Sequence, residues 1–219
     1  MIKEKINQLL AQLPAQVRLI AVSKTKPVSD ILEAYTAGQR DFGENKVQEL
    51  VEKQAQLPTD IRWHLIGHLQ SNKVKYVSAF VHLIHAVDSL KLLQEINKQA
   101  LKAQRIQKVL LQFYIAQEET KFGLSRIEAT ELLDAPAYKE LQNIEICGVM
   151  GMASFTDDET QVRKEFGLLK EIFDELKASY FAQQASFCEI SMGMSGDYLI
   201  AIEEGSTMVR VGSSIFGGR

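Results

Sequence analysis

The lysine that ends the first apolar segment has the chemistry to form a Schiff base. Lys24 follows RLIAVS (residues 18–23), which we expect to be a buried strand, and Lys26 follows two residues later. An amine at the end of a buried strand is partly removed from water, which lowers its pKa, and the neutral amine is the form that attacks a carbonyl carbon. Lys24 is the better candidate because it adjoins the strand. The alternative is that both are solvated loop residues, as most lysines are.

Two segments rich in glycine and serine could hold a phosphate. ISMGMSGD (190–197) and RVGSSIFGG (210–218) end two expected strands and contain Ser195, Gly212 and Ser213. Small residues let the backbone approach an anion, and hydroxyls and unpaired N–H groups at a helix start bind phosphate oxygens. Two tight turns without a ligand are the alternative. A lysine facing such a cradle suits a phosphorylated aldehyde, and pyridoxal 5′-phosphate (PLP) is the usual one.

A single arginine interrupts the apolar segment before the second cradle. Arg210 lies in TMVRVGSS, and a buried guanidinium needs a partner. It could form an internal ion pair with Glu203 or Glu204. It could instead face a pyridine nitrogen and keep that nitrogen unprotonated, which would make the ring a poor electron sink. The pattern leaves both interpretations open.

The four histidines do not have the spacing of a metal site. His82 and His85 are three residues apart on an expected strand, so we expect them on opposite faces. His64 and His68 lack the helix on which an H-x₃-H zinc pair lies. His64, in WHLIG, could line the mouth of a barrel or could be a core histidine with its hydrogen bonds satisfied. We therefore predict no metal.

Short apolar segments alternate with helical patterns along the whole chain. Several segments are almost continuously apolar, which is typical of parallel strands buried on both faces. The expected strands cover residues 18–23, 41–43, 62–67, 81–87, 109–115, 145–152, 187–193 and 207–216, and the expected helices include 44–54, 88–103 and 158–181. Eight strands after a leading helix predict an α/β fold over residues 1–219, a single (β/α)₈ TIM barrel with an extra N-terminal helix. An open doubly wound sheet is the alternative.

Composition and charge narrow the function classes. The chain has 219 residues, 46% of them apolar, and a net charge of −3, which gives no reason to expect nucleic acid or an anionic membrane as a partner. No apolar run approaches the ~20 residues of a membrane span. The N-terminal residues mix charges into an amphipathic helix, unlike a signal peptide. Cys147 and Cys188 do not make a disulfide framework, so we expect a cytoplasmic protein.

Five motifs resemble the pyridoxal-phosphate homeostasis proteins, the YggS/PROSC family. They are AVSKTKP (21–27), FGENKVQE (42–49), WHLIGHLQSNK (63–73), KFG (121–123) and SMGMSGDYLIAIEEGSTMVRVGSSIFG (191–217). The resemblance extends from the first expected strand to the last. It implies a PLP fold-type-III barrel like the N-terminal domain of alanine racemase, with PLP held as an internal aldimine.

The resemblance also implies roles for particular residues. Lys24 matches the Schiff-base lysine and Arg210 the residue near the pyridine nitrogen. Asn45 and His64 match groups that line the pocket. The residues implied in phosphate binding are Met194, Ser195, Gly212 and Ser213. Many family members have threonine at the position of Ser213; the hydroxyl is retained here, so this departure does not put phosphate binding in doubt.

The family is not known for a catalysed reaction, and we expect a PLP-binding protein of intracellular PLP homeostasis without catalytic residues. PLP-dependent apoenzymes are candidate recipients, and we expect a monomer. A PLP-dependent racemase is the main alternative, but it needs a second proton-transfer group opposite Lys24. Only Tyr114 and Tyr198 lie near an expected strand end, and the sequence ends two residues after the last motif, where we expect no second domain. A phosphate-binding barrel enzyme without PLP is a third possibility.

Overall fold

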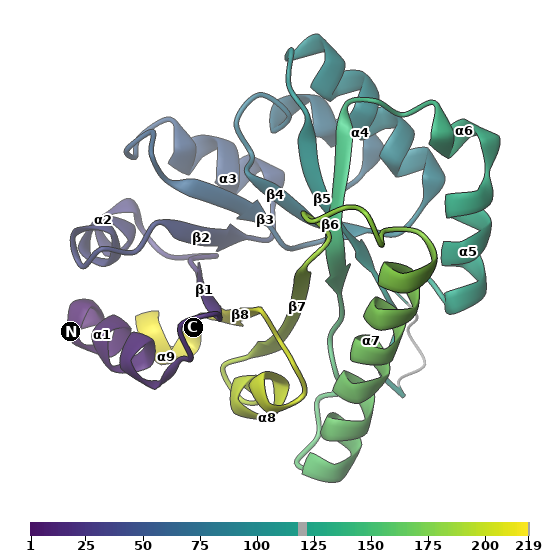
Figure 1. Ribbon diagram of the computed structural model, residues 1–219. Coiled ribbons are helices and arrows are strands. Elements are labelled where there is room, and N and C mark those ends of the chain that lie inside the picture. The colour runs from purple at the N-terminus through teal and green to yellow at the C-terminus, as the bar shows by residue number, and fades with distance from the viewer. Residues whose placement is uncertain (118–121, 219) are drawn as a thin grey trace.

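The chain forms a closed barrel of parallel strands that pair in sequence order. The computed structural model describes residues 1–117 and 122–218, and in it the last strand pairs with the first (Figure 1). The strands are β1 (Arg18–Val22), β2 (Asp41–Glu44), β3 (Arg62–Leu65), β4 (Leu83–Val87), β5 (Gln107–Gln112), β6 (Ile144–Met150), β7 (Glu189–Met194) and β8 (Met208–Val211). The predicted (β/α)₈ barrel is therefore confirmed, and the open sheet is excluded.

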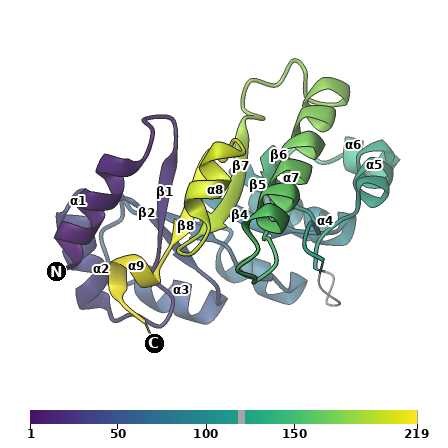
Figure 2. The ribbon, with the colours of Figure 1, turned by 90° about the horizontal axis from the view of Figure 1, so that it is seen from below.

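Helices follow the strands and cover the outside of the barrel. They are α1 (Ile2–Gln12), α2 (Val28–Thr36), α3 (Val47–Gln54), the 3₁₀ helix η1 (Ser71–Tyr76), α4 (Leu90–Lys102), α5 (Arg126–Asp134), α6 (Pro136–Lys139), α7 (Glu159–Ser179), α8 (Tyr198–Glu203) and α9 (Ser213–Phe216). The predicted extra helix is α1, which packs against α2 and α9. Figures 1 and 2 show these three helices together on one side of the barrel, near both chain ends.

Alternating side chains of several strands belong to two separate apolar clusters. Ile20 of β1 lies in a small cluster with Leu110 and Met208. Its neighbours Leu19 and Ala21 lie in a much larger cluster that includes the buried faces of the helices. The small cluster joins residues of β1, β4, β5, β6 and β8 and therefore lies in the barrel interior, while the large one lies between the barrel and the helices. Burial on both sides explains why the strands are apolar throughout.

Several predicted elements differ in extent from the structure, and two of these differences change which element a residue belongs to. The last expected strand, 207–216, ends at Val211, because Gly212 leaves the extended conformation and α9 begins at Ser213. The expected helix at 44–54 begins only at Val47, and Glu44 is instead the last residue of β2. Both changes occur at the carboxyl end of a strand, where the chain turns over the top of the barrel.

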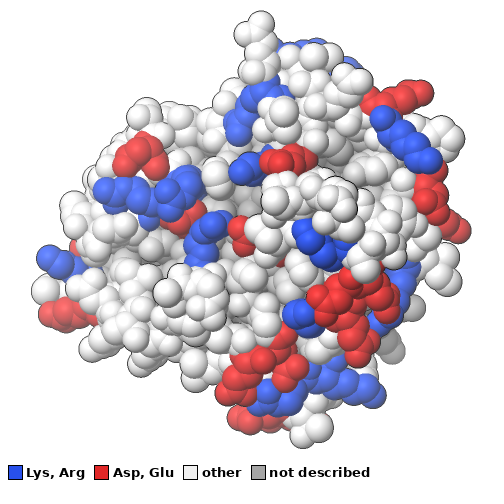
Figure 3. Space-filling view, viewed as in Figure 1, with Lys and Arg blue, Asp and Glu red and all other residues white. Residues whose placement is uncertain are grey.

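The surface carries both signs of charge close together. Figure 3 shows acidic and basic side chains intermixed over the region where α7 and α8 lie, and there Arg163 bonds Glu203 and Glu204 at 2.6 and 2.7 Å. Cys147 and Cys188 are both free thiols. Among residues 1–117 and 122–218, no helix is both long enough and apolar enough to cross a membrane.

Candidate functional site

One cavity of about 520 Å³ lies over the carboxyl ends of β1, β2, β7 and β8. This is the end of the barrel at which functional groups collect in TIM-barrel proteins. Seven of the eight residues singled out in the sequence line it: Lys24, Asn45, Met194, Ser195, Arg210, Gly212 and Ser213. The eighth, His64, does not. Lys121 of the KFG motif lies outside the described residues.

Lys24 is half-buried in a tight turn that leaves β1. The Lys26 N–H donates to the Ser23 carbonyl at 3.0 Å, which closes the turn, and Thr25 within it has a φ of +65°. Lys26 also lines the cavity, but its Nζ donates to the Gly218 carbonyl at 3.0 Å. The two lysines therefore differ. The Lys26 amine bonds the turn to the C-terminal segment, while the Lys24 amine forms no hydrogen bond with the described part of the chain.

Small residues bring β7 and β8 close together on the other side of the cavity. Gly193 has a φ of +92°, and a Cβ there would lie 2.6 Å from the Ala201 Cβ. The Gly212 N–H donates to the Ser195 hydroxyl at 3.2 Å, and a Cβ on Gly212 would lie 3.0 Å from the Val22 carbonyl oxygen. Glycine is therefore required at position 193 for steric reasons, and a side chain at position 212 would press closely against the end of β1. The segments after β7 and β8 are joined by this hydrogen bond.

Unpartnered amide groups accompany these glycines. Among the residues that the structure describes, the backbone N–H groups of Ser195, Gly196, Ser213 and Ser214 have no hydrogen-bond acceptor. Ser213 lines the same cavity, and its hydroxyl likewise has no partner among the described residues. Convergent N–H and hydroxyl donors form an anion-binding concavity, as a phosphate requires.

Arg210 lies at the floor of the cavity and is 4% exposed. Its Nη1 donates to the Ser191 hydroxyl at 2.7 Å and its Nη2 to the Gly151 carbonyl at 3.0 Å. Burial lowers the pKa of Arg210 to about 10, with the charge of Asp197 opposing the shift. The guanidinium therefore stays protonated at neutral pH and can only donate hydrogen bonds.

The alternative ion pair of Arg210 with Glu203 or Glu204 is wrong. Both glutamates lie on the outer surface and bond Arg163 of α7. They follow β7 in α8, which packs on the outside of the barrel, while Arg210 faces inward from β8. No carboxylate in the described chain forms a salt bridge with Arg210.

His64 lies below the cavity rather than at its edge. It is fully buried, with Nε2 at 3.0 Å from the Asp41 carboxylate and Nδ1 at 3.0 Å from His85 Nε2. Ile66, two residues later and just beyond the end of β3, lines the cavity instead. The expectation that His64 lines the pocket is therefore not met, because the residue sits one layer deeper in the barrel.

His82 and His85 are not separated as predicted. The rings of both lie against the ring of His64, with centroids 5.5 and 5.2 Å away. His82 precedes β4, and β4 has a register irregularity between Ile84 and Val87, so strict alternation does not apply across it. Burial lowers the pKa of His85 well below its usual value and that of His82 to about 4. Within the described residues no cluster could hold a metal ion.

A chain of buried hydrogen bonds crosses the barrel from Arg210 to Asp41. Arg210 donates to Ser191, whose hydroxyl lies 2.9 Å from His85 Nδ1, and His85 contacts His64, which contacts Asp41. One assignment satisfies every group: each donates to the next, both histidines are neutral and protonated on Nε2, and Asp41 is ionised. The sequence analysis missed Ser191 and Asp41, whose partners come from distant strands.

The loop between β6 and α7 supplies cavity residues that the sequence analysis also missed. Met152, Ser154, Thr156 and Asp157 line the cavity. Ser154 is fixed by the buried Glu165 of α7, which accepts from its N–H at 2.6 Å and its hydroxyl at 2.8 Å. The strand-end rule points to this loop because it follows β6, although its residues have no distinctive pattern.

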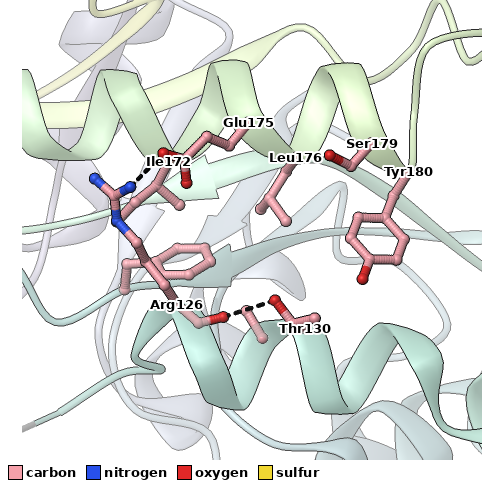
Figure 4. A pocket seen from close by; sticks show the side chains of 9 residues that line it. Arg126, Thr130, Ile172, Glu175, Leu176, Ser179 and Tyr180 are labelled. Atoms are coloured by element: carbon pink, nitrogen blue, oxygen red, sulfur yellow. Dashed lines mark hydrogen bonds and ion pairs between the residues drawn. The ribbon is translucent and has the colours of Figure 1, made fainter.

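A second cavity, of about 350 Å³, lies between α5 and α7 on the outside of the barrel. Figure 4 shows Arg126 reaching from the start of α5 to Glu175 of α7, with Ser179 and Tyr180 at the other end. The Arg126 and Glu175 side chains are both substantially exposed. None of the residues predicted from the sequence lies here, so the first cavity is the candidate site.

Comparison with known proteins assigns this barrel to a family. The family model described as alanine racemase, N-terminal domain, matches residues 1–219. The pyridoxal phosphate homeostasis protein of Aquifex aeolicus is 40% identical over 203 residues, which cover 92% of this chain and 87% of that protein. The chain therefore belongs to the alanine racemase N-terminal domain family and, within it, to the pyridoxal phosphate homeostasis proteins.

Solved structures agree with this assignment. PipY of Synechococcus elongatus, solved with PLP bound, superimposes with a TM-score of 0.88 at 39% identity, over 99% of this chain and 100% of PipY. The alanine racemase of Clostridium difficile has a TM-score of 0.76 at 16% identity, over 100% of this chain and 56% of the racemase. The second similarity concerns the fold alone.

Proposed function

We propose that this chain binds PLP covalently through Lys24 and holds it for intracellular PLP homeostasis, without catalysing a reaction. The observation that carries the proposal is one cavity in which Lys24 faces both a set of unpartnered phosphate donors and a buried arginine. The bound group would supply an aldehyde carbon, to which the amine nitrogen forms a double bond while the carbonyl oxygen leaves as water with the two amine protons.

The cradle fits the phosphate of such a ligand. The Ser213 hydroxyl and the N–H groups of Ser195, Gly196 and Ser213 belong to residues that line the cavity, and they are donors without acceptors in the described chain. A doubly charged phosphate offers several oxygen acceptors to such a set. The tight space at Gly212 supports the fit, since a side chain there would press against the end of β1.

Arg210 fits the pyridine nitrogen. Two of its five N–H groups are used by Ser191 and Gly151, and the side chain lines the cavity floor. A protonated guanidinium has no acceptor, so it can bond only a ring nitrogen that carries no proton. An unprotonated ring withdraws electrons weakly and stabilises a carbanion poorly. This residue therefore favours holding the cofactor over carbanion chemistry.

The cavity lining also favours a carrier over a racemase. Racemisation needs groups on both faces of the substrate carbon, one to remove a proton and one to return it. Within the described residues no tyrosine and no histidine lines the cavity. The Tyr198 hydroxyl lies 3.1 Å from the Gln12 amide oxygen of α1, outside the barrel. The catalytically silent role, a cytoplasmic location, a monomeric state and delivery to apoenzymes all remain predictions.

The decisive experiment is to locate the covalent bond. Purified protein incubated with PLP should show a visible absorbance band, and borohydride reduction followed by peptide mapping should place the label on Lys24. Lys24→Ala should abolish both, whereas the matched Lys26→Ala variant should keep both, because the Lys26 amine is bonded to Gly218. A band that survives in Lys24→Ala, or a label on another lysine, would refute the assignment.

A further inference from the structure

A buried cluster of charges lies directly behind the turn that carries Lys24. We call Glu44, Glu49 and Lys53 the Lys53 cluster. Lys53 is only 6% exposed although it is charged, and Glu44 is fully buried. The Lys53 ammonium donates to Glu44 Oε1 at 2.7 Å and to Glu49 Oε1 at 2.6 Å. None of the three residues lines the cavity, so their contact with the site is through the turn.

The cluster bonds the turn on both sides of Lys24. The third proton of the Lys53 ammonium goes to the Ser23 carbonyl at 2.7 Å, and the Ser23 hydroxyl donates to Glu44 Oε1 at 2.6 Å. The Thr25 N–H donates to Glu49 Oε1 at 2.5 Å. The residues immediately before and after Lys24 are therefore each fixed to this cluster, and Lys53 has used all three of its donors.

The backbone of the turn needs such support. A β-branched residue such as threonine rarely adopts a positive φ, yet Thr25 has a φ of +65°. Such a conformation persists only where surrounding interactions determine it. The bond from the Thr25 N–H to Glu49 supplies this constraint, and Lys53 holds Glu49 in position.

We propose that Lys53, through Glu44 and Glu49, is a positioning residue that holds the Ser23–Lys26 turn in the conformation that presents the Lys24 amine to the cavity. This inference rests on the proposed function and adds to it. The cluster governs covalent capture of the aldehyde and has no part in phosphate binding, because the cradle is built by β7, β8 and the segments after them.

The two steps can be measured separately with two ligands. Pyridoxine 5′-phosphate carries the same ring and phosphate as PLP but has an alcohol in place of the aldehyde, so it binds without a covalent bond. We define the covalent preference as the Kd of pyridoxine 5′-phosphate divided by the Kd of PLP. Lys53→Met should lower this preference about tenfold or more, the usual effect of losing a charge-assisted hydrogen bond. The Kd of pyridoxine 5′-phosphate should stay within about twofold of wild type.

Lys177→Met is the matched control. Lys177 also donates from Nζ to a backbone carbonyl, that of Gln184 at 2.6 Å, but it lies on α7 next to the loop that enters β7, away from the cavity. Its covalent preference should equal that of wild type. Equal weakening of both ligands in Lys53→Met would indicate a purely structural role, and an unchanged preference would show that the cluster does not position Lys24. Either result overturns the inference.

A second pair of variants keeps the test valid if Lys53→Met does not fold. Glu49 is partly exposed, so its removal disturbs the core less. Glu49→Ala removes the acceptor of the Thr25 N–H and should lower the covalent preference, whereas Glu49→Gln keeps an oxygen there and should largely restore it. Equal preferences in the two variants would refute the inference. A wild-type protein without any covalent preference would refute the proposed function itself, which distinguishes the two failures.

Discussion

Ser213 and Ser214 are adjacent serines that allow the phosphate cradle to be tested with a built-in control. Both are exposed at the start of α9, but only Ser213 lines the cavity. Neither hydroxyl has a hydrogen-bond partner among the described residues. Replacing either by alanine therefore removes no contact within the protein, and both variants should keep the wild-type free energy of unfolding within about 0.5 kcal/mol.

The expected loss of affinity follows from one hydrogen bond. Removing a donor to a charged group costs about 1.5–3 kcal/mol, so Ser213→Ala should weaken PLP binding about 10- to 150-fold. Ser214→Ala keeps its backbone N–H and loses only a hydroxyl that does not face the cavity, so its Kd should match wild type. The backbone donors around Ser195 and Ser213 remain in both variants, which is why binding is weakened and not abolished.

The assay is a titration of PLP into each protein, in which the visible absorbance band of the bound PLP is measured. The titration is repeated with pyridoxal, which has no phosphate. Pyridoxal should bind wild type far more weakly than PLP. It should also bind Ser213→Ala and wild type equally, because the lost donor has no partner in that ligand. Equal Kd values of PLP and pyridoxal for wild type, or equal losses in the two serine variants, would show that this cavity wall does not hold the phosphate.

Two further predictions concern the barrel interior and the absence of turnover. Burial alone would raise the pKa of Asp41, but hydrogen bonds from Arg62 and His64 outweigh it and hold the pKa well below its usual range. The stability that ionised Asp41 contributes is complete above pH ~4 and is lost as the pH falls toward the pKa of Asp41 in the folded protein. The difference in unfolding free energy between wild type and Asp41→Asn, measured by urea titration, should therefore be smaller at pH 3 than at pH 7. A difference that does not change with pH would contradict this. PLP-loaded protein incubated with L-alanine in deuterated water should give no D-alanine, since the described cavity lining has no tyrosine or histidine to deliver a proton to the face opposite Lys24. Conversion to α-deuterated D-alanine that disappears in Lys24→Ala would establish a racemase.

The barrel could be predicted because the residue pattern of each strand depends directly on what the strand packs against. A strand with apolar residues on both faces is stable only between two apolar layers, and β1, β4 and β5 have that character. The end of the last strand was harder to predict. Residues 213–216 are Ser-Ser-Ile-Phe, which ends on two apolar residues, and only Gly212, which leaves the extended conformation, separates this segment from β8.

The sequence predicted which side chains face the barrel interior but not how far along the barrel each of them lies. Side chains two residues apart on a strand share a face and lie about 6.6 Å apart along the strand, so they belong to different layers of the barrel. His64 faces inward from β3 and Ile66 lies just beyond the end of that strand, and only Ile66 reaches the cavity. On β8, Met208 belongs to the interior cluster while Arg210 lines the cavity floor. Periodicity identifies the face, and only the packed barrel shows which layer forms the floor.

The Lys53 cluster was beyond sequence reasoning for a different reason. Glu44, Glu49 and Lys53 fall in a segment whose charges are typical of a solvated helix surface, and the expected helix included all three. In the structure Glu44 ends β2 on the outer face of the barrel wall, and α3 covers it. An apolar residue normally occupies such a position, because a buried carboxylate needs a partner. Only the packing of α3 against β2 shows that these three charged side chains contact one another. The contact lies behind the turn whose backbone geometry sets the position of the Lys24 amine.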